Sequence, residues 1–148
     1  YTLMSSDFPY RIRMVNWRNE ESNLRSIRSA VFITEQNVPE EMEWDSMDQI
    51  CAHILVQDFE GNGIGTARLL PDGHIGRMAV LKVWRRKGIG SAMLQKILQE
   101  MRALGMKKAT LHAQLTAVEF YEKFGFQKCG KEFMEAGIPH VIMVLDLP

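Results

Sequence analysis

The chain has little of what marks several large classes of protein. Among its 148 residues it has only two cysteines, Cys51 and Cys129, without CxxC spacing and without a His-rich cluster beside them. A disulfide framework or a zinc site is therefore not expected, and no other metal is implied. Two reduced thiols are typical of a cytosolic protein.

Net charge and long apolar runs are also missing. The formal net charge is zero, whereas nucleic-acid binders usually carry a basic excess, so we expect no nucleic-acid partner. No apolar run approaches the roughly 20 residues that span a bilayer. The N-terminal stretch "YTLMSSDFPY" is too polar for a signal peptide. We therefore expect no membrane partner and a cytoplasmic location.

What the chain does have is an ordinary globular composition, 46% hydrophobic and 24% charged, with no repeat or linker. Residues 1–148 are therefore expected to form a single domain. Apolar residues alternate at strand spacing or recur at helical spacing along most of the chain. The periods predict helices at 20–36, 89–104 and 116–124, an irregular acidic stretch at 38–49, and strands at 10–15, 51–59, 64–70, 74–80, 107–113, 126–133 and 140–147. This order predicts a mixed α/β domain.

One strand-to-helix junction carries an unusual cluster, "RRKGIGS" at 85–91. The first N–H groups of a helix have no intrahelical partner, and the helix dipole adds positive charge there. Gly88 and Gly90 have no side chain to keep a ligand from that backbone, and Arg85, Arg86 and Lys87 add positive charge. The junction indicates a site for a diphosphate or a similar anion. A plain helix start with solvated charges is the simpler alternative.

Two nucleotide motifs are excluded at this junction. The P-loop pattern GxxxxGK[ST] does not occur, and the dinucleotide pattern GxGxxG fails because Met93 stands where the third glycine would be. The anion site therefore needs another interpretation.

Arg85-x-x-Gly88-x-Gly90 resembles the coenzyme A pyrophosphate loop of the GNAT N-acetyltransferase superfamily. About 30 residues later, "AQLTAVEFYEKFGF" resembles the second signature of that superfamily, with Ala117, Phe120, Tyr121, Gly125 and Phe126 in its characteristic positions. "AVFITEQNVPEEMEWDSMD" and "GKEFMEAGIPHVIM" are similar to the ElaA/YjcF-type branch. The resemblance implies one GNAT domain, a mostly antiparallel twisted sheet flanked by helices in the order β-α-(α)-β-β-β-α-β-α-β-β.

The resemblance also implies an activity. A GNAT enzyme transfers an acetyl group from acetyl-CoA to a primary amine of a small molecule or a protein, by direct attack in a ternary complex. Gln114 stands where many members have Asn, and family members are often homodimers. The cofactor-binding residues implied are Met78, Ala79, Val80, Arg85, Arg86, Lys87, Gly88, Ile89, Gly90, Ser91, Gln114, Phe120 and Tyr121.

The family resemblance assigns Tyr121 as the acid that protonates the leaving thiolate, while a backbone N–H, that of Val80, would face the oxyanion. Removing a proton from the acceptor ammonium needs a base, and the acidic stretch from 35 to 48 supplies candidates. Glu35 is preferred and Glu43 comes next, with Glu40, Glu41, Asp45 and Asp48 as further carboxylates. Of the histidines, His53 is interpreted as a core residue, and His140 fits either a structural role or the acceptor side.

Two other functions are compatible with the same residues. One is a non-catalytic acyl-CoA-binding or sensing module with the same fold. The other is a general phosphate- or nucleotide-binding domain that would not depend on the pantetheine arm. The sequence identifies neither the acceptor amine nor the length of the acyl group.

Overall fold

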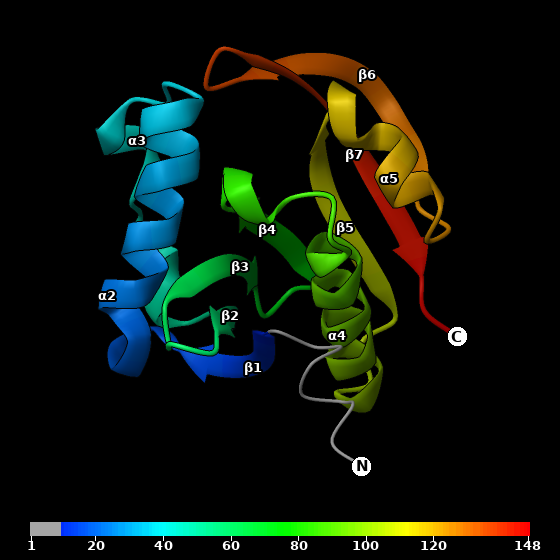
Figure 1. Ribbon diagram of the computed structural model, residues 1–148. Helices are drawn as coiled ribbons and strands as arrows, with labels where there is room; N and C mark the ends of the chain where they lie inside the picture. The colour runs from blue at the N-terminus through cyan, green and yellow to red at the C-terminus, as the bar shows by residue number, and fades with distance from the viewer. Residues whose placement is uncertain (1–9) are drawn as a thin grey trace.

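A computed structural model describes residues 10–148 and shows a seven-stranded sheet with helices on both faces (Figure 1). The N-terminal stretch that we judged too polar for a signal peptide lies almost wholly outside the described residues. The strands are β1 (Tyr10–Asn16), β2 (Ala52–Asp58), β3 (Gly63–Leu69), β4 (His74–Val80), β5 (Lys108–Gln114), β6 (Gln127–Glu135) and β7 (Ile138–Asp146). The α-helices are α2 (Trp17–Arg28), α3 (Glu40–Glu43), α4 (Ile89–Ala103) and α5 (Val118–Glu122).

The strands lie in the order β1-β2-β3-β4-β5-β7-β6. Every neighbouring pair is antiparallel except β4 and β5, which are parallel. A parallel pair needs a crossover connection, and α4 supplies it. The predicted fold is confirmed, including the short second helix before β2 and the mostly antiparallel sheet.

Alternation along the strands assigns each face of the sheet to a helix. On β2, Ile54 and Val56 belong to the larger core under α4, whereas Leu55 between them packs with Leu24 and Ile27 of α2. All five side chains are almost fully buried. Successive strand residues point to opposite faces, so a continuous apolar run such as "ILV" indicates a strand covered on both sides.

The two halves of the sheet separate between β4 and β5. Only His74↔Thr110 and Ile75↔Leu111 are paired, although each strand has seven residues. Just beyond these pairs β4 carries a bulge, because its register against β3 shifts and Arg77 adopts a positive φ of 50°. A bulge bends and twists its strand. The last residues of β4 therefore have no strand neighbour on the β5 side.

Several predicted boundaries differ from the structure. The stretch predicted as irregular at 38–49 contains α3 and a 3₁₀-helix, Ser46–Gln49. The helix predicted at 20–36 begins at Trp17, where the side chain of Asn16 accepts a hydrogen bond from the Asn19 N–H, and it continues beyond Arg28 as a π-helix, Ser29–Glu35. The gap left between the strands predicted at 126–133 and 140–147 shrinks to a tight turn at Ala136 and Gly137, both with positive φ, which lengthens β6 and β7.

The remaining expectations concern membranes and cysteines. No helix between residues 10 and 148 is both long and apolar enough to cross a bilayer. Cys51 is buried and Cys129 is exposed, and both are free thiols.

Candidate active site

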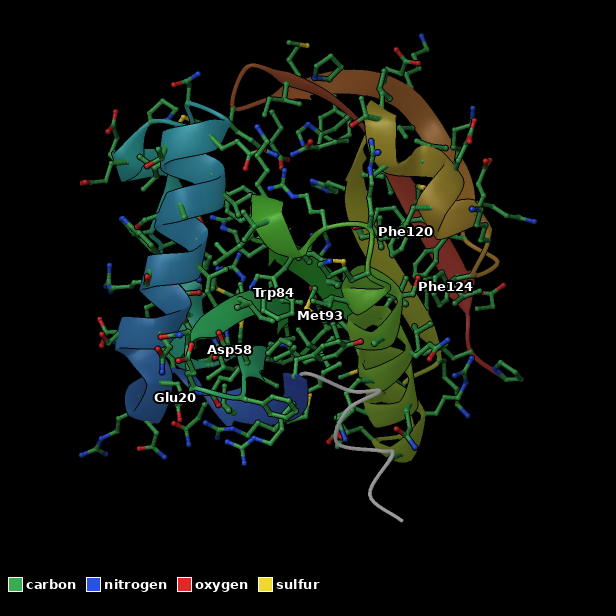
Figure 2. The ribbon with its side chains drawn as sticks, in the orientation of Figure 1. Glu20, Asp58, Trp84, Met93, Phe120 and Phe124 are labelled. Carbon is green, nitrogen blue, oxygen red and sulfur yellow. The ribbon has the colours of Figure 1, made fainter. Side chains whose placement is uncertain are left out.

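A groove of about 460 Å³ opens where β4 departs from the sheet and α4 begins. Trp84 and Phe120, labelled in Figure 2, come from the segments before and after α4 and line this groove. All the predicted cofactor-binding residues except Lys87 and Gln114 line it. They are Met78, Ala79, Val80, Arg85, Arg86, Gly88, Ile89, Gly90, Ser91, Phe120 and Tyr121.

The backbone at the start of α4 leaves room for an anionic group. No side chain caps the helix, and its first hydrogen bond runs from the Ala92 N–H to the Gly88 carbonyl at 3.0 Å. The preceding N–H groups therefore lack helical partners. A Cβ at Gly88 would have no heavy atom within 4 Å, and one at Gly90 would lie 3.5 Å from Phe120. The glycines keep this space free, so the loop fits a pyrophosphate.

Left-handed backbone recurs in the same loop. Arg86 has φ 63° and Gly88 has φ 80°. A non-glycine residue in this region is uncommon and marks a local constraint, and such turns aim successive N–H groups into one concavity that suits an anion. The strained position of Arg86 is consistent with that use.

Arg85 connects this loop to the end of the π-helix. Its guanidinium makes two hydrogen bonds of 2.6 Å to the carboxylate of Glu35, and its Nε donates to the Val80 carbonyl at 2.9 Å. The hydrogen bonds from Arg85 hold the pKa of Glu35 below its usual value. Glu35, the preferred base from the sequence, thus faces Arg85. It does not line the larger cavity of the protein, which lies beyond the gap between β4 and β5.

A larger cavity of about 700 Å³ lies on the other side of the gap between β4 and β5. The β6–β7 hairpin arches over it toward α3 (Figure 1), and residues of the hairpin turn and of α3 both line it. Met78, Ala117 and Tyr121 line this cavity and the groove alike. The two hollows therefore meet beside Tyr121.

Tyr121 is held firmly at this junction. Its hydroxyl donates to the Met78 sulfur at 3.6 Å, and its ring lies edge-on to Phe120 and Phe126 with centroids 5.0 and 5.9 Å away. Burial raises the pKa of Tyr121 to about 12. The phenol therefore keeps its proton at neutral pH and is available as a donor.

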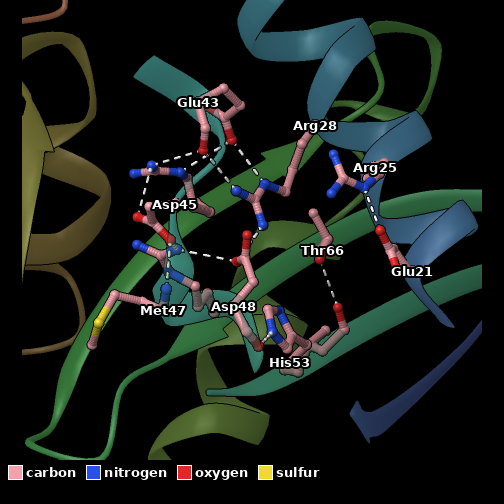
Figure 3. Close-up of polar contacts among 12 residues, drawn as sticks. Glu21, Arg25, Arg28, Glu43, Asp45, Met47, Asp48, His53 and Thr66 are labelled. Carbon is pink, nitrogen blue, oxygen red and sulfur yellow. Dashed lines mark hydrogen bonds and ion pairs between the residues drawn. The ribbon is translucent and has the colours of Figure 1, made fainter. Parts of the chain in front are cut away.

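Two carboxylates of the acidic stretch, Glu43 and Asp48, belong to a buried ion network, shown in Figure 3. The Glu43 carboxylate lines the cavity, but its Oε2 lies 2.7 Å from Arg28 Nε and 3.1 Å from Arg77 Nε. Asp48 Oδ1 pairs with Arg28 at 2.7 Å and with Arg68 at 3.1 Å. These carboxylates are thus neutralised by arginines.

The other carboxylates of α3 and the turn after it lie at the edge of the network or outside it. Asp45 pairs with Arg68 and Arg77, and Glu40 and Glu41 are exposed at the start of α3. Gln36 accepts a hydrogen bond from the amide of Gln114 at 3.0 Å, so Gln114 belongs to the larger cavity rather than to the groove.

The histidines divide between the core and the cavity. His53 is buried, its Nε2 lies 2.8 Å from the Asp48 carbonyl, and burial lowers its pKa, which suits a core residue. His140 lines the cavity. His74, His112 and Glu135 line it as well, and the sequence analysis did not indicate these three residues. Alternation could have indicated His112, because Ala109, Leu111 and Ala113 face the core on β5 and leave the even positions facing the other way.

Similarity to known proteins agrees with this geometry. The profile of the family described as "Acetyltransferase (GNAT) domain" matches residues 18–147. The uncharacterized N-acetyltransferase YjcF of Bacillus subtilis is 38% identical over 124 residues, which cover 81% of this chain and 88% of YjcF.

Two solved structures are similar over nearly their whole length. ElaA of Escherichia coli superposes with a TM-score of 0.81 at 27% identity, covering 91% of this chain and 98% of ElaA. An acyl-CoA N-acyltransferase from Pseudomonas aeruginosa superposes with a TM-score of 0.82 at 25% identity, with the same coverage. The chain therefore belongs to the GNAT acetyltransferase family, in the branch that holds YjcF and ElaA.

Proposed function

We propose that the protein is an acetyl-CoA-dependent N-acetyltransferase that acts on the primary amine of a small molecule or a protein. The observation that carries the proposal is the meeting of groove and cavity at Tyr121. A thioester held from one side and an amine held from the other would come together beside the phenol. We also propose that the protein is cytoplasmic and has no nucleic-acid or membrane partner, because its formal net charge is zero and its apolar runs are short.

Each end of the groove has a part in holding the cofactor. N–H groups from Arg86 to Ser91 would bind the pyrophosphate, and Lys87 would add charge from the rim. The open edge of β4 at Met78, Ala79 and Val80 would pair with the pantetheine amides, since strand pairing with β5 ends at Ile75. We assign the Val80 N–H to the developing oxyanion, where one donor contributes roughly 10²–10³-fold to the rate.

Acetyl-CoA supplies an activated thioester when bound, and the residues of the chain carry out the proton transfers. An ammonium acceptor arrives with three N–H protons. One stays on the product amide, one reaches the departing sulfur through the Tyr121 hydroxyl, and one must leave before attack. For a lysine-like amine with a pKa of about 10.4, that last step costs roughly 4.6 kcal/mol at pH 7.

Calorimetry with acetyl-CoA, using ADP as the comparison ligand, is the first test. We expect clear binding of acetyl-CoA and much weaker binding of ADP, followed by thiol release when a panel of amines is added. Equal binding of ADP would point to a general nucleotide site instead. Binding without thiol release from any amine would identify a non-catalytic acyl-CoA-binding module. Failure to bind acetyl-CoA would end the proposal.

A further inference from the structure

Three imidazoles and one carboxylate gather in the acceptor cavity from four different strands. His74 comes from β4, His112 from β5, Glu135 from β6 and His140 from β7, and all four line the cavity. The rings of His74 and His112 meet edge to face with centroids 4.8 Å apart. Glu135 Oε1 lies 2.8 Å from His112 Nδ1, and Glu135 Oε2 lies 3.9 Å from His140 Nε2.

The contact with Glu135 fixes the tautomer of His112. A carboxylate can only accept a hydrogen bond, so His112 Nδ1 must carry the proton at 2.8 Å. In the neutral ring the other nitrogen, Nε2, then holds a free lone pair. Glu135 therefore prepares His112 to take up a proton at Nε2 and faces the positive charge that results.

Two other carboxylates in the cavity are already engaged. Glu43 is paired with two arginines, and Asp72 accepts the backbone N–H of His74 at 3.0 Å in the turn before β4. His140 also has Nδ1 on an acceptor, the Ile138 carbonyl at 2.6 Å, but its side chain is only 8% exposed and its Nε2 lies 3.9 Å from Glu135. Among the histidines of the cavity, His112 is the one whose side chain is both hydrogen-bonded to a carboxylate and exposed to solvent, with an exposed fraction of 34%.

His74 and Phe133 are the direct ring neighbours of His112. Burial, and then the nearby His112, lower the pKa of His74, which makes His74 a weak base. Phe133 lies edge-on to His112 at 5.1 Å and stacks on His140 at 5.9 Å, which closes the β6 side with an apolar wall. The charged groups facing this cluster are Asp72, Glu135 and Arg68.

We propose that His112, oriented by Glu135, is the general base that deprotonates the acceptor ammonium. The ammonium gives one proton to His112 Nε2, and its freed lone pair attacks the acetyl carbon. The C–S bond breaks, and the sulfur takes its proton from Tyr121, which recovers one from the attacking nitrogen. The imidazolium returns its proton to solvent. This inference rests on the proposed function, because it assigns a role within the same site.

Kinetics with two probe amines provide one test. Benzylamine enters as an ammonium at pH 7, whereas methoxyamine enters neutral. We expect His112→Asn to lower kcat/KM for benzylamine by about 10²–10⁴-fold and to change that for methoxyamine less than tenfold. Equal losses for both amines would overturn the proposal.

Glu135→Gln tests the orienting role. We expect a smaller loss with benzylamine than in His112→Asn, with unchanged acetyl-CoA affinity by calorimetry. Glu132→Gln is the matched control, because Glu132 is an exposed carboxylate on the same strand. A loss in Glu132→Gln as large as in Glu135→Gln would overturn the role of Glu135.

The tautomer decides the proposal even if neither probe amine is turned over. Nitrogen-15 spectra of the imidazole rings should show His112 with its proton on Nδ1, and Glu135→Gln should weaken that preference. A wild-type His112 protonated on Nε2 would sink the proposal while leaving acetyl-CoA binding, and thus the proposed function, intact. Failure of the wild-type protein to bind acetyl-CoA would instead contradict the proposed function.

Discussion

Tyr121 is packed as a core aromatic would be, yet its hydroxyl lies where two hollows join. Phenylalanine in its place keeps the packing and removes only the proton donor. We expect Tyr121→Phe to lower kcat by about 10²–10⁴-fold with the acceptor found in the amine screen. The affinity for acetyl-CoA, measured by calorimetry, should change little.

Tyr10→Phe is a suitable control, because Tyr10 lies on β1 and lines neither hollow. Since the pKa of Tyr121 is raised to about 12 by burial, its loss should not remove any limb of the pH profile near neutrality. Unchanged kcat in Tyr121→Phe would assign the acid role to another group.

Glu35 separates two hypotheses about the base. It was the preferred base from the sequence, but both its oxygens are bonded to Arg85. We expect Glu35→Gln to leave kcat within a few-fold of wild type and to lower the unfolding free energy by less than about 1 kcal/mol, as is usual for exposed pairs. Steady-state kinetics and urea unfolding check the two parts.

Glu21→Gln is the matched control, since Glu21 is an exposed carboxylate bonded to Arg25 on the outer side of α2. If Glu35→Gln were to reduce kcat a hundredfold while Glu21→Gln did not, Glu35 rather than His112 would be the base.

At the scale of an element, the two ends of α4 offer a comparison. Gly88 and Gly105 both have positive φ, and a Cβ at either would meet no heavy atom within 4 Å. Alanine at such a φ costs about 1–2 kcal/mol, so both substitutions should lower stability to a similar extent in urea unfolding. Only Gly88→Ala should also weaken acetyl-CoA binding, because only Gly88 lies in the groove. Equal affinity in both variants would move the pyrophosphate away from this helix end.

Arg28, Glu43 and Asp48 form an ion network behind α3. Arg28 is fully buried, pairs with Glu43 and Asp48, and lies over Trp17 and Trp44 at 5.4 and 4.9 Å. Arg28→Ala would leave two buried carboxylates short of a partner, and we expect it to lower the unfolding free energy by about 3–5 kcal/mol. The network thus fixes the wall of the cavity on the α3 side.

Arg25→Ala is the matched control for that loss. Arg25 also lies over Trp17 and Trp44, but its ion pair with Glu21 is exposed. We expect Arg25→Ala to cost about 1 kcal/mol in the same urea titration. A smaller loss for Arg28→Ala than for Arg25→Ala would contradict the structural role of the network.

Local pattern was enough to predict most elements and an anion site at the α4 start, because strand alternation, helix spacing and glycine positions are local. The order of elements and the residues at the α4 start are of this kind. The other residues that line the groove were implied only by the resemblance to the GNAT superfamily. An apolar stripe does not distinguish an α-helix from the π-helix at Ser29–Glu35, since both bury one face. Nor did the sequence indicate that β6 extends to Glu135 and places its carboxylate on His112. Such contacts depend on register between strands that are distant in sequence.

For the whole molecule, the main feature is a sheet in two parts. Strands β1 to β4 form one part and β5, β7 and β6 the other, with only two residue pairs joining β4 to β5 (Figure 1). The groove and the cavity both lie along this division. A ligand inserted against β4 would contact α4 and α5 as well, and so would hold the two parts together.

Acetyl-CoA should therefore stabilise the entire fold. At a concentration 100 times Kd, binding adds about 2.7 kcal/mol, which corresponds to a rise in Tm of about 5–10 °C for a chain of this size. Scanning fluorimetry measures the shift, and hydrogen exchange should slow most at Val80, whose N–H faces the open edge of β4. ADP at the same concentration should do little, because it lacks the pantetheine arm that would lie along that edge. An equal rise in Tm with ADP, or slowing confined to the α4 start, would mean that the ligand is held by its phosphates alone and does not bridge the sheet.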